Sequence, residues 1–162
     1  MPRILTAIFM TCLLAATAVA ADKSWVAKSN EHAQVVLAAF AELAPEGAGN
    51  LGVDGLDENI SDLSPGFEDR ARETIEGVLA ELQSRLEDET DPKVRQDLGI
   101  LIQAAEDNLE TQRLQEQYML PYMNVNQMVF GALRALIDPQ VARERYPAAI
   151  VRMEKYAGLR DG

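Results

Sequence analysis

The sequence predicts an all-α protein, with a long antiparallel helical hairpin, shorter helices after Pro121 and a signal peptide at the start. Apolar residues recur every three or four positions over long stretches, which is the period of an amphipathic helix. Prolines stand just inside or just beyond the expected helix ends, where they start or stop helices. With 162 residues, 48% of them hydrophobic, the chain is long enough for one buried core.

Residues 1–20 are expected to be a secretory signal peptide, cut after Ala20 or Ala21. Residues 1–3 are a short basic start, residues 4–17 are mostly apolar, and residues 18–20 have the small side chains of a cleavage site. A membrane anchor is disfavoured, because the apolar run is short for a span of about 20 residues. We therefore expect a periplasmic or secreted protein without a stable membrane span after cleavage. Its mature part, 21–162, is expected to be a single helical domain or the N-terminal fragment of a larger one.

Cysteine content and charge exclude several function classes. Cys12 is the only cysteine and lies inside the expected leader, so we expect no disulfide, no thiolate catalysis and no cysteine-ligated zinc. The net charge is −11. Nucleic acid is not expected as a partner, because its affinity comes largely from Lys and Arg that neutralise phosphates. Helices this acidic also disfavour binding to a membrane surface.

The first expected helix runs from Ser24 to Leu43, and Pro45 ends it. His32, the only histidine, has Glu31 beside it but no second histidine at ligand spacing. We expect His32 to face solvent rather than to bind a metal or to act as a general base.

Residues 45–64 are expected to form a loop rich in Gly, Asp and Asn. A stretch this long without periodicity is either functional or mobile. Calcium binding is one alternative, but Asp54-Gly55-Leu56-Asp57 lacks the order of an EF-hand loop. A solvated loop is the favoured interpretation.

The hairpin is predicted from two helix starts of the same kind. Ser64 as N-cap and Pro65 at the first helical position begin a helix that continues to about Glu87. After a turn at 87–90, Asp91-Pro92 begins a second helix that continues to Pro121. Two long helices joined by so short a turn must lie antiparallel.

The outer face of the hairpin is expected to be charged and solvated. Ion pairs are expected from Glu68 to Arg72 and from Glu81 to Arg85, at the i,i+4 spacing. The acids Glu106, Asp107 and Glu110 are expected to face solvent. Helical carboxylate metal sites also use histidines on facing helices, and none is present here.

Beyond Pro121, Asn124 is expected to cap a helix over 125–137, and Asp138-Pro139 to end it. A helix or turn follows through Arg145. A last helix covers 146–156 and stops at Gly158.

The break at Pro121 concentrates the candidate residues for ligand or interdomain contact. A polar and aromatic patch of this kind suits a binding groove. Its members are Tyr118, Tyr122, Asn124, Asn126 and Gln127. The alternative is that Met119 and Met123 fill gaps, Asn124 caps a helix and Gln127 is exposed.

No catalytic motif is found. The chain contains neither His-Glu-x-x-His nor Gly-x-Ser-x-Gly, and no phosphate-binding Gly-x-x-x-x-Gly-Lys. Gly47, Gly49 and Gly52 have the spacing Gly-x-Gly-x-x-Gly, but they follow an expected helix rather than a strand, so they lack the context of a dinucleotide-binding turn. We therefore expect no catalytic residue, no metal ligand and no cofactor in this chain.

The order of parts resembles the N-terminal part of the bacterial domain of unknown function 885 family. The matching features are a leader, an Asp/Gly loop closing on Leu-Ser-Pro, and a long acidic hairpin. The short matching segments are 63–65, 118–122, 138–141 and 152–159. Members of that family are mostly secreted, longer, largely helical proteins that look like zinc metallopeptidases of the gluzincin kind.

The resemblance covers nearly all of the mature chain but assigns no site residue. The zinc motif of that family is similar to His-Glu-x-x-His and lies far downstream of the region matched. The resemblance thus implies an N-terminal fragment of a secreted zinc-dependent peptidase-like hydrolase, inactive alone. Its partner would be the missing C-terminal part, and zinc is expected only for full-length members. The alternative is a stand-alone periplasmic helical binding or adaptor module, so whether the protein is an enzyme stays open.

Overall fold

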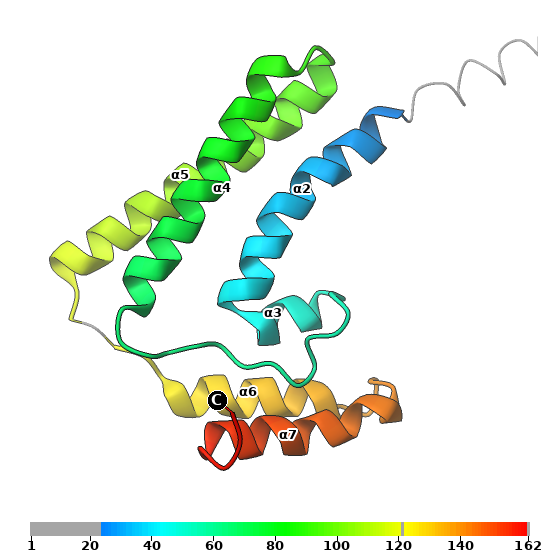
Figure 1. The fold of residues 1–162 in the computed structure, drawn as a ribbon, viewed down its shortest axis with the longest axis vertical. Coiled ribbons are helices and arrows are strands. Elements are labelled where there is room, and N and C mark those ends of the chain that lie inside the picture. Colours follow the sequence, from blue (N-terminus) through cyan, green and yellow to red (C-terminus); the bar gives the residue numbers. More distant parts are fainter. Residues whose placement is uncertain (1–23, 121, 162) are drawn as a thin grey trace, which may run out of the picture.

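The computed structural model describes residues 24–120 and 122–161 (Figure 1). These residues form helices and no strand, so the all-α fold class is confirmed. The expected signal peptide and Pro121 lie outside the described residues. The elements are α2 (Ser24–Leu43), α3 (Pro45–Asn50), α4 (Phe67–Asp88), α5 (Pro92–Tyr118), α6 (Val125–Ile137), the 3-10 turn η2 (Arg143–Arg145) and α7 (Tyr146–Tyr156).

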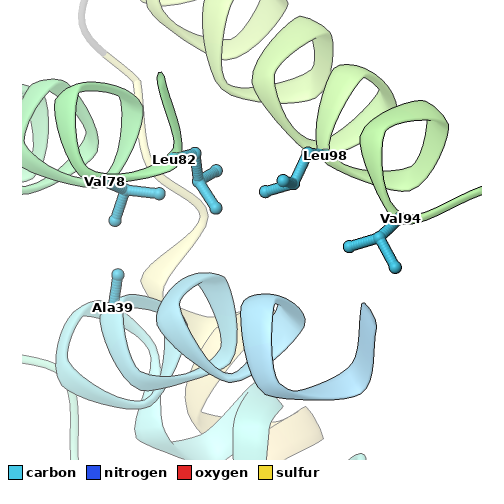
Figure 2. Close-up of a cluster of buried hydrophobic side chains, with 5 residues drawn as sticks. All are labelled: Ala39, Val78, Leu82, Val94 and Leu98. Atoms are coloured by element: carbon cyan, nitrogen blue, oxygen red, sulfur yellow. The ribbon is translucent and has the colours of Figure 1, made fainter. Parts of the chain in front are cut away.

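Helices α4 and α5 form the predicted antiparallel hairpin, and α2 packs against both of them (Figure 1). Figure 2 shows the core of this three-helix layer, where short aliphatic side chains from all three helices meet. Each aliphatic side chain that becomes fully buried stabilises the fold by roughly 1.5–3 kcal/mol. The members of this core are Ala39, Val78, Leu82, Val94 and Leu98.

Helices α6 and α7 form a second layer, side by side across the ends of the longer helices (Figure 1). This pair has its own small core of Leu136, Ala148 and Ala149. The described residues therefore form two apolar clusters, and the α3 segment lies between the two layers.

Three of the predicted helix signals act as expected. Asp91 caps α5 by accepting a hydrogen bond from the Lys93 N–H, at 2.9 Å. Asn124 caps α6 in the same way. Gly158, at φ +68°, ends α7 in a Schellman motif, in which the Leu159 N–H donates to the Glu154 carbonyl at 2.8 Å.

The predicted start of α4 at Ser64-Pro65 is wrong by about half a turn. Ser64 and Pro65 instead form a turn, in which the Phe67 N–H donates to the Ser64 carbonyl at 3.2 Å. Gly66 precedes the helix at φ +83°, a backbone conformation that favours glycine, and α4 begins at Phe67.

One of the two predicted ion pairs is also wrong. Arg85 bonds Glu81 at 2.8 Å, as expected. Arg72 does not pair with Glu68. It pairs with Asp69 and, at 2.9 Å, with Glu116 of α5, because the antiparallel hairpin brings that carboxylate within reach.

The predicted loop over 45–64 begins with a helix, α3. Pro45 occupies its first turn and Ala48 is fully buried. Gly47 allows α3 to approach α2, because a Cβ at this position would lie 2.7 Å from Cζ of Phe40. Six residues with two glycines are too few to show a helical period, which explains the missed element.

Candidate functional site

The five predicted contact residues lie at an exposed connection between α5 and α6. Tyr118 and Tyr122 are 73% and 84% exposed. Asn124 accepts the Gln127 N–H at 3.1 Å, which is the capping role, and Asn126 and Gln127 are exposed. None of the five lines either of the two hollows described below. The structure therefore places them together along the chain, but around neither of these two hollows.

The same connection is an exposed apolar stretch, and we call residues 118–120 and 122–125 the joint. Leu120 is 91% exposed. Met119 and Met123 are 64% and 45% exposed, so the expectation that they fill gaps in the core is wrong. Contiguous apolar exposure of this kind is typical of surfaces that contact another protein.

A groove lies between α2 and the hairpin, and we call it the α2–hairpin groove. Its volume is about 410 Å³ and its lining is almost entirely apolar. Phe40 of α2, 37% exposed, lines one wall. The polar side chains that line it are Asn108 and Gln112 of α5. Apolar clefts with a few polar groups are the usual form of a binding site.

A second hollow, of about 590 Å³, lies on the hairpin itself and is mostly charged. Arg72 and Arg113 line it together with four glutamates. Arg113 bonds Glu110 at 2.7 Å, and that hydrogen bond lowers the pKa of Glu110 below its ordinary value. Arg72 also pairs with Glu116, so two of the four glutamates are paired on an exposed surface, which is the arrangement of a solvated charged face.

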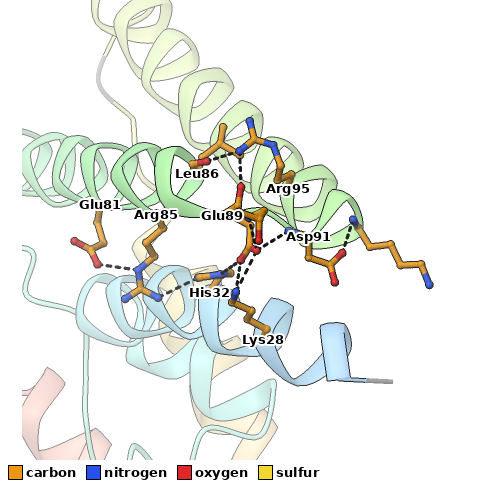
Figure 3. Close-up of polar contacts among 10 residues, drawn as sticks. Lys28, His32, Glu81, Arg85, Leu86, Glu89, Asp91 and Arg95 are labelled. Atoms are coloured by element: carbon orange, nitrogen blue, oxygen red, sulfur yellow. Dashed lines mark hydrogen bonds and ion pairs between the residues drawn. The ribbon is translucent and has the colours of Figure 1, made fainter. Parts of the chain in front are cut away.

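Glu89 is a buried ionic centre in the turn between α4 and α5 (Figure 3). It is 5% exposed. Its carboxylate accepts the backbone N–H groups of Thr90 and Asp91, each at 2.8 Å, and pairs with Lys28 of α2 at 2.9 Å. The Asp91 N–H and the Lys28 ammonium lower the pKa of Glu89 to about 2. The sequence at 87–90 predicts only a turn and contains no signal for this link to α2.

His32 points into the same centre, so the expectation that it faces solvent is wrong. It is 8% exposed because α2 packs against the hairpin at this position. Arg85 donates to its Nδ1 at 3.2 Å, and Glu89 lies 3.7 Å from its Nε2 (Figure 3). A guanidinium beside Nδ1 and a carboxylate already bound by Lys28 do not suit zinc.

No metal site is found in the part of the chain that the structure describes. Within 24–120 and 122–161, no group of three or more His, Cys, Asp and Glu side chains is arranged to hold a metal ion. In the same ranges no helix is both long and apolar enough to cross a membrane.

A buried carboxylate, Glu46, fastens α3 to α7. Its oxygens accept the Tyr156 hydroxyl at 2.6 Å and the hydroxyl and N–H of Ser61 at 2.6 and 2.9 Å. Burial alone would raise the pKa of Glu46, but these hydrogen bonds outweigh burial and hold the pKa below its ordinary value. Burial and the bond to Glu46 raise the pKa of Tyr156. A carboxylate held ionised and a phenol held protonated are poor proton carriers at neutral pH, so the cluster is structural.

Arg152 of α7 is the largest fully buried side chain, at 1% exposed. It donates three hydrogen bonds of 3.0 Å to backbone carbonyls, those of Leu56, Asn59 and Ala132. The loop 51–64 after α3 is thus attached to α7 at Leu56 and Asn59, while most of its residues are exposed, as expected of a solvated loop. Nearby, Arg145 bonds Asp57 at 2.6 Å, which lowers the pKa of Asp57.

Comparisons with family models, with curated proteins and with solved structures found no match to this chain.

The Glu89 centre predicts a loss of stability in acid. Because the folded pKa of about 2 lies below the ordinary 4.5, the ionised carboxylate stabilises the fold above about pH 4.5. That contribution is lost as the pH falls from 4.5 towards 2. Urea denaturation from pH 7 to pH 2.5 should show a shallower decline for Glu89→Gln than for the parent chain. Glu87→Gln changes an exposed glutamate two residues away, in the last turn of α4, and should keep the parent profile. A decline for Glu89→Gln as steep as that of the parent chain would contradict the prediction.

Proposed function

We propose that the chain is the N-terminal helical part of a secreted, zinc-peptidase-like hydrolase, and that it supplies packing surface instead of catalytic groups. The exposed joint carries this proposal. Large apolar side chains that are 45% to 91% exposed stand next to one another there, and burying them against a further helical part would stabilise both. The occupant we propose for the joint is the catalytic part of the same protein.

Two further observations support the proposal. Three of the four buried ionisable side chains of the described residues, Glu46, Glu89 and Arg152, hold elements of this fold together. The signal-like start and the short segments described above support secretion and the peptidase-like relationship.

A dye-binding experiment tests the exposed joint. The folded chain is expected to enhance the fluorescence of an anilinonaphthalene dye, and Leu120→Ser with Tyr122→Ser should remove most of that enhancement. The matched control is Leu51→Ser, which changes a leucine that is 73% exposed outside the joint. Fluorescence that stays unchanged in the joint variant would contradict the proposal.

A hydrolysis assay tests the absence of a catalytic role. The purified chain with added zinc should not hydrolyse peptide substrates. Hydrolysis that a chelator abolishes would show that the catalytic groups lie in this chain and would contradict the proposal.

The second candidate function is a stand-alone periplasmic binding module, and the α2–hairpin groove favours it. A cooperative thermal transition without dye binding would support this candidate over the first.

A further inference from the structure

The α2–hairpin groove is a site distinct from the joint. It lies where α2 packs on the hairpin, and its lining comes from α2, α4 and α5 but from no residue of the joint. Side chains such as Val36, Ile75 and Leu101 line it without filling it. A groove of about 410 Å³ between three helices has the form that admits one face of a further helix.

The helix segments around this groove are strongly acidic. Segments 36–44, 67–78 and 101–112 hold eight acidic and two basic residues. The two basic residues, Arg70 and Arg72, already form ion pairs inside the chain. The acidic residues are Glu42, Glu68, Asp69, Glu73, Glu76, Glu106, Asp107 and Glu110, of which Glu76, Glu106 and Glu110 line the separate hairpin hollow.

Helical spacing places acids beside the groove on α4 and α5. Glu68 lies three and seven residues before Ala71 and Ile75 of the lining. Asp97 lies four and seven residues before Leu101 and Ala104. The apolar floor therefore has acidic flanks on these two helices.

We propose that the α2–hairpin groove binds a basic amphipathic helix presented by a partner protein. The apolar face of that helix covers the floor of the groove, and its lysines and arginines lie over the acidic flanks, which steer association and fix orientation. A second copy of this chain is disfavoured as the occupant, because two chains of charge −11 repel one another. An anionic lipid surface is disfavoured for the same reason.

The test titrates labelled designed peptides against the chain and follows fluorescence anisotropy. The probe has about 18 residues, roughly five turns, with leucines along one face and lysines on the other. One control peptide keeps the leucines and replaces the lysines by glutamates. The other has the composition of the probe in scrambled order. We expect saturable binding of the probe, about tenfold tighter than of either control, and weaker in high salt.

Two glutamine substitutions on α5 form a matched pair. Gln112→Lys puts a positive charge into the groove lining, whereas Gln96→Lys adds the same charge at an exposed position outside it. The first should weaken binding of the probe about fivefold or more, and the second less than twofold. Gln112→Glu should tighten binding. Because all three changes replace half-buried or exposed side chains, the folded helix content should stay the same by circular dichroism.

Three results would overturn the inference. Equal binding of the scrambled peptide would mean diffuse attraction to an acidic surface. Equal binding of the glutamate peptide would mean that charge plays no part. A dimer in light scattering that is broken by Gln112→Lys would mean that a second copy covers the groove. The joint variants Leu120→Ser and Tyr122→Ser should leave binding of the probe unchanged, so failure at the groove and failure of the proposed function are distinguishable.

Discussion

Arg152→Met is expected to lower the free energy of unfolding by about 3 kcal/mol or more, since three hydrogen bonds from a charged group are lost and each contributes about 1.5–3 kcal/mol. Arg152 donates to three carbonyls, two of which lie more than ninety residues away along the chain. A methionine fills much of the space but donates nothing. Replacement of a whole buried ionic cluster by apolar residues can be neutral, but here the carbonyls would remain.

Urea denaturation followed by circular dichroism measures this effect. The matched control is Arg160→Met, which removes an arginine whose side chain is 49% exposed and makes one 3.4 Å contact with Glu154. Exposed pairs of this kind contribute about 0–1 kcal/mol. A loss for Arg152→Met no larger than that for Arg160→Met would show that the three carbonyls find other donors, and would contradict the assigned role of Arg152.

The helices with clear local signals could be predicted from the sequence. α6 has the predicted bounds, because Asn124 caps its first turn and Asp138-Pro139 follows its last one. The start of α5 follows from Asp91-Pro92 in the same way. These signals act within one turn of the chain, so they do not depend on the rest of the fold.

The features that were missed depend on contacts between distant residues. The burial of His32 results from the packing of α2 against α4, and no pattern around His32 encodes it. The role of Glu89 requires Lys28, which lies 61 residues away. The sequence contains one local signal for the burial of Arg152. This arginine lies three residues after Ala149 and four after Ala148, on the buried face of α7. A lone arginine on an apolar stripe indicates a buried guanidinium with partners elsewhere.

The two candidate sites differ in the same way, because a local signal marks one and only the packing of distant helices forms the other. The exposed joint could be anticipated, because tyrosines and methionines gather around a helix break. The α2–hairpin groove could not, since its lining comes from three helices whose relative placement no local signal defines. The functional proposals rest on these two surfaces, so their tests must preserve the core that positions the helices.

Leu82→Ala tests that core, and is expected to lower the free energy of unfolding by about 2–5 kcal/mol. Leu82 of α4 is fully buried between α2 and α5, in the same core cluster as Leu98 (Figure 2). The substitution removes the transfer free energy of the lost methyl groups and leaves a cavity that helices joined by a short turn cannot easily close. Thermal and urea denaturation should both show the loss.

Leu114→Ala on α5 is the matched control, because the same side chain is 40% exposed there. Leu114→Ala should lower the free energy of unfolding by well under half as much as Leu82→Ala, since surface substitutions leave little cavity. Leu82→Ala should also weaken binding of the basic peptide, because α2, α4 and α5 form both this core and the groove. Equal losses of stability for the two leucine variants would mean that α2 does not pack on the hairpin as described. The groove would then lose one of its walls.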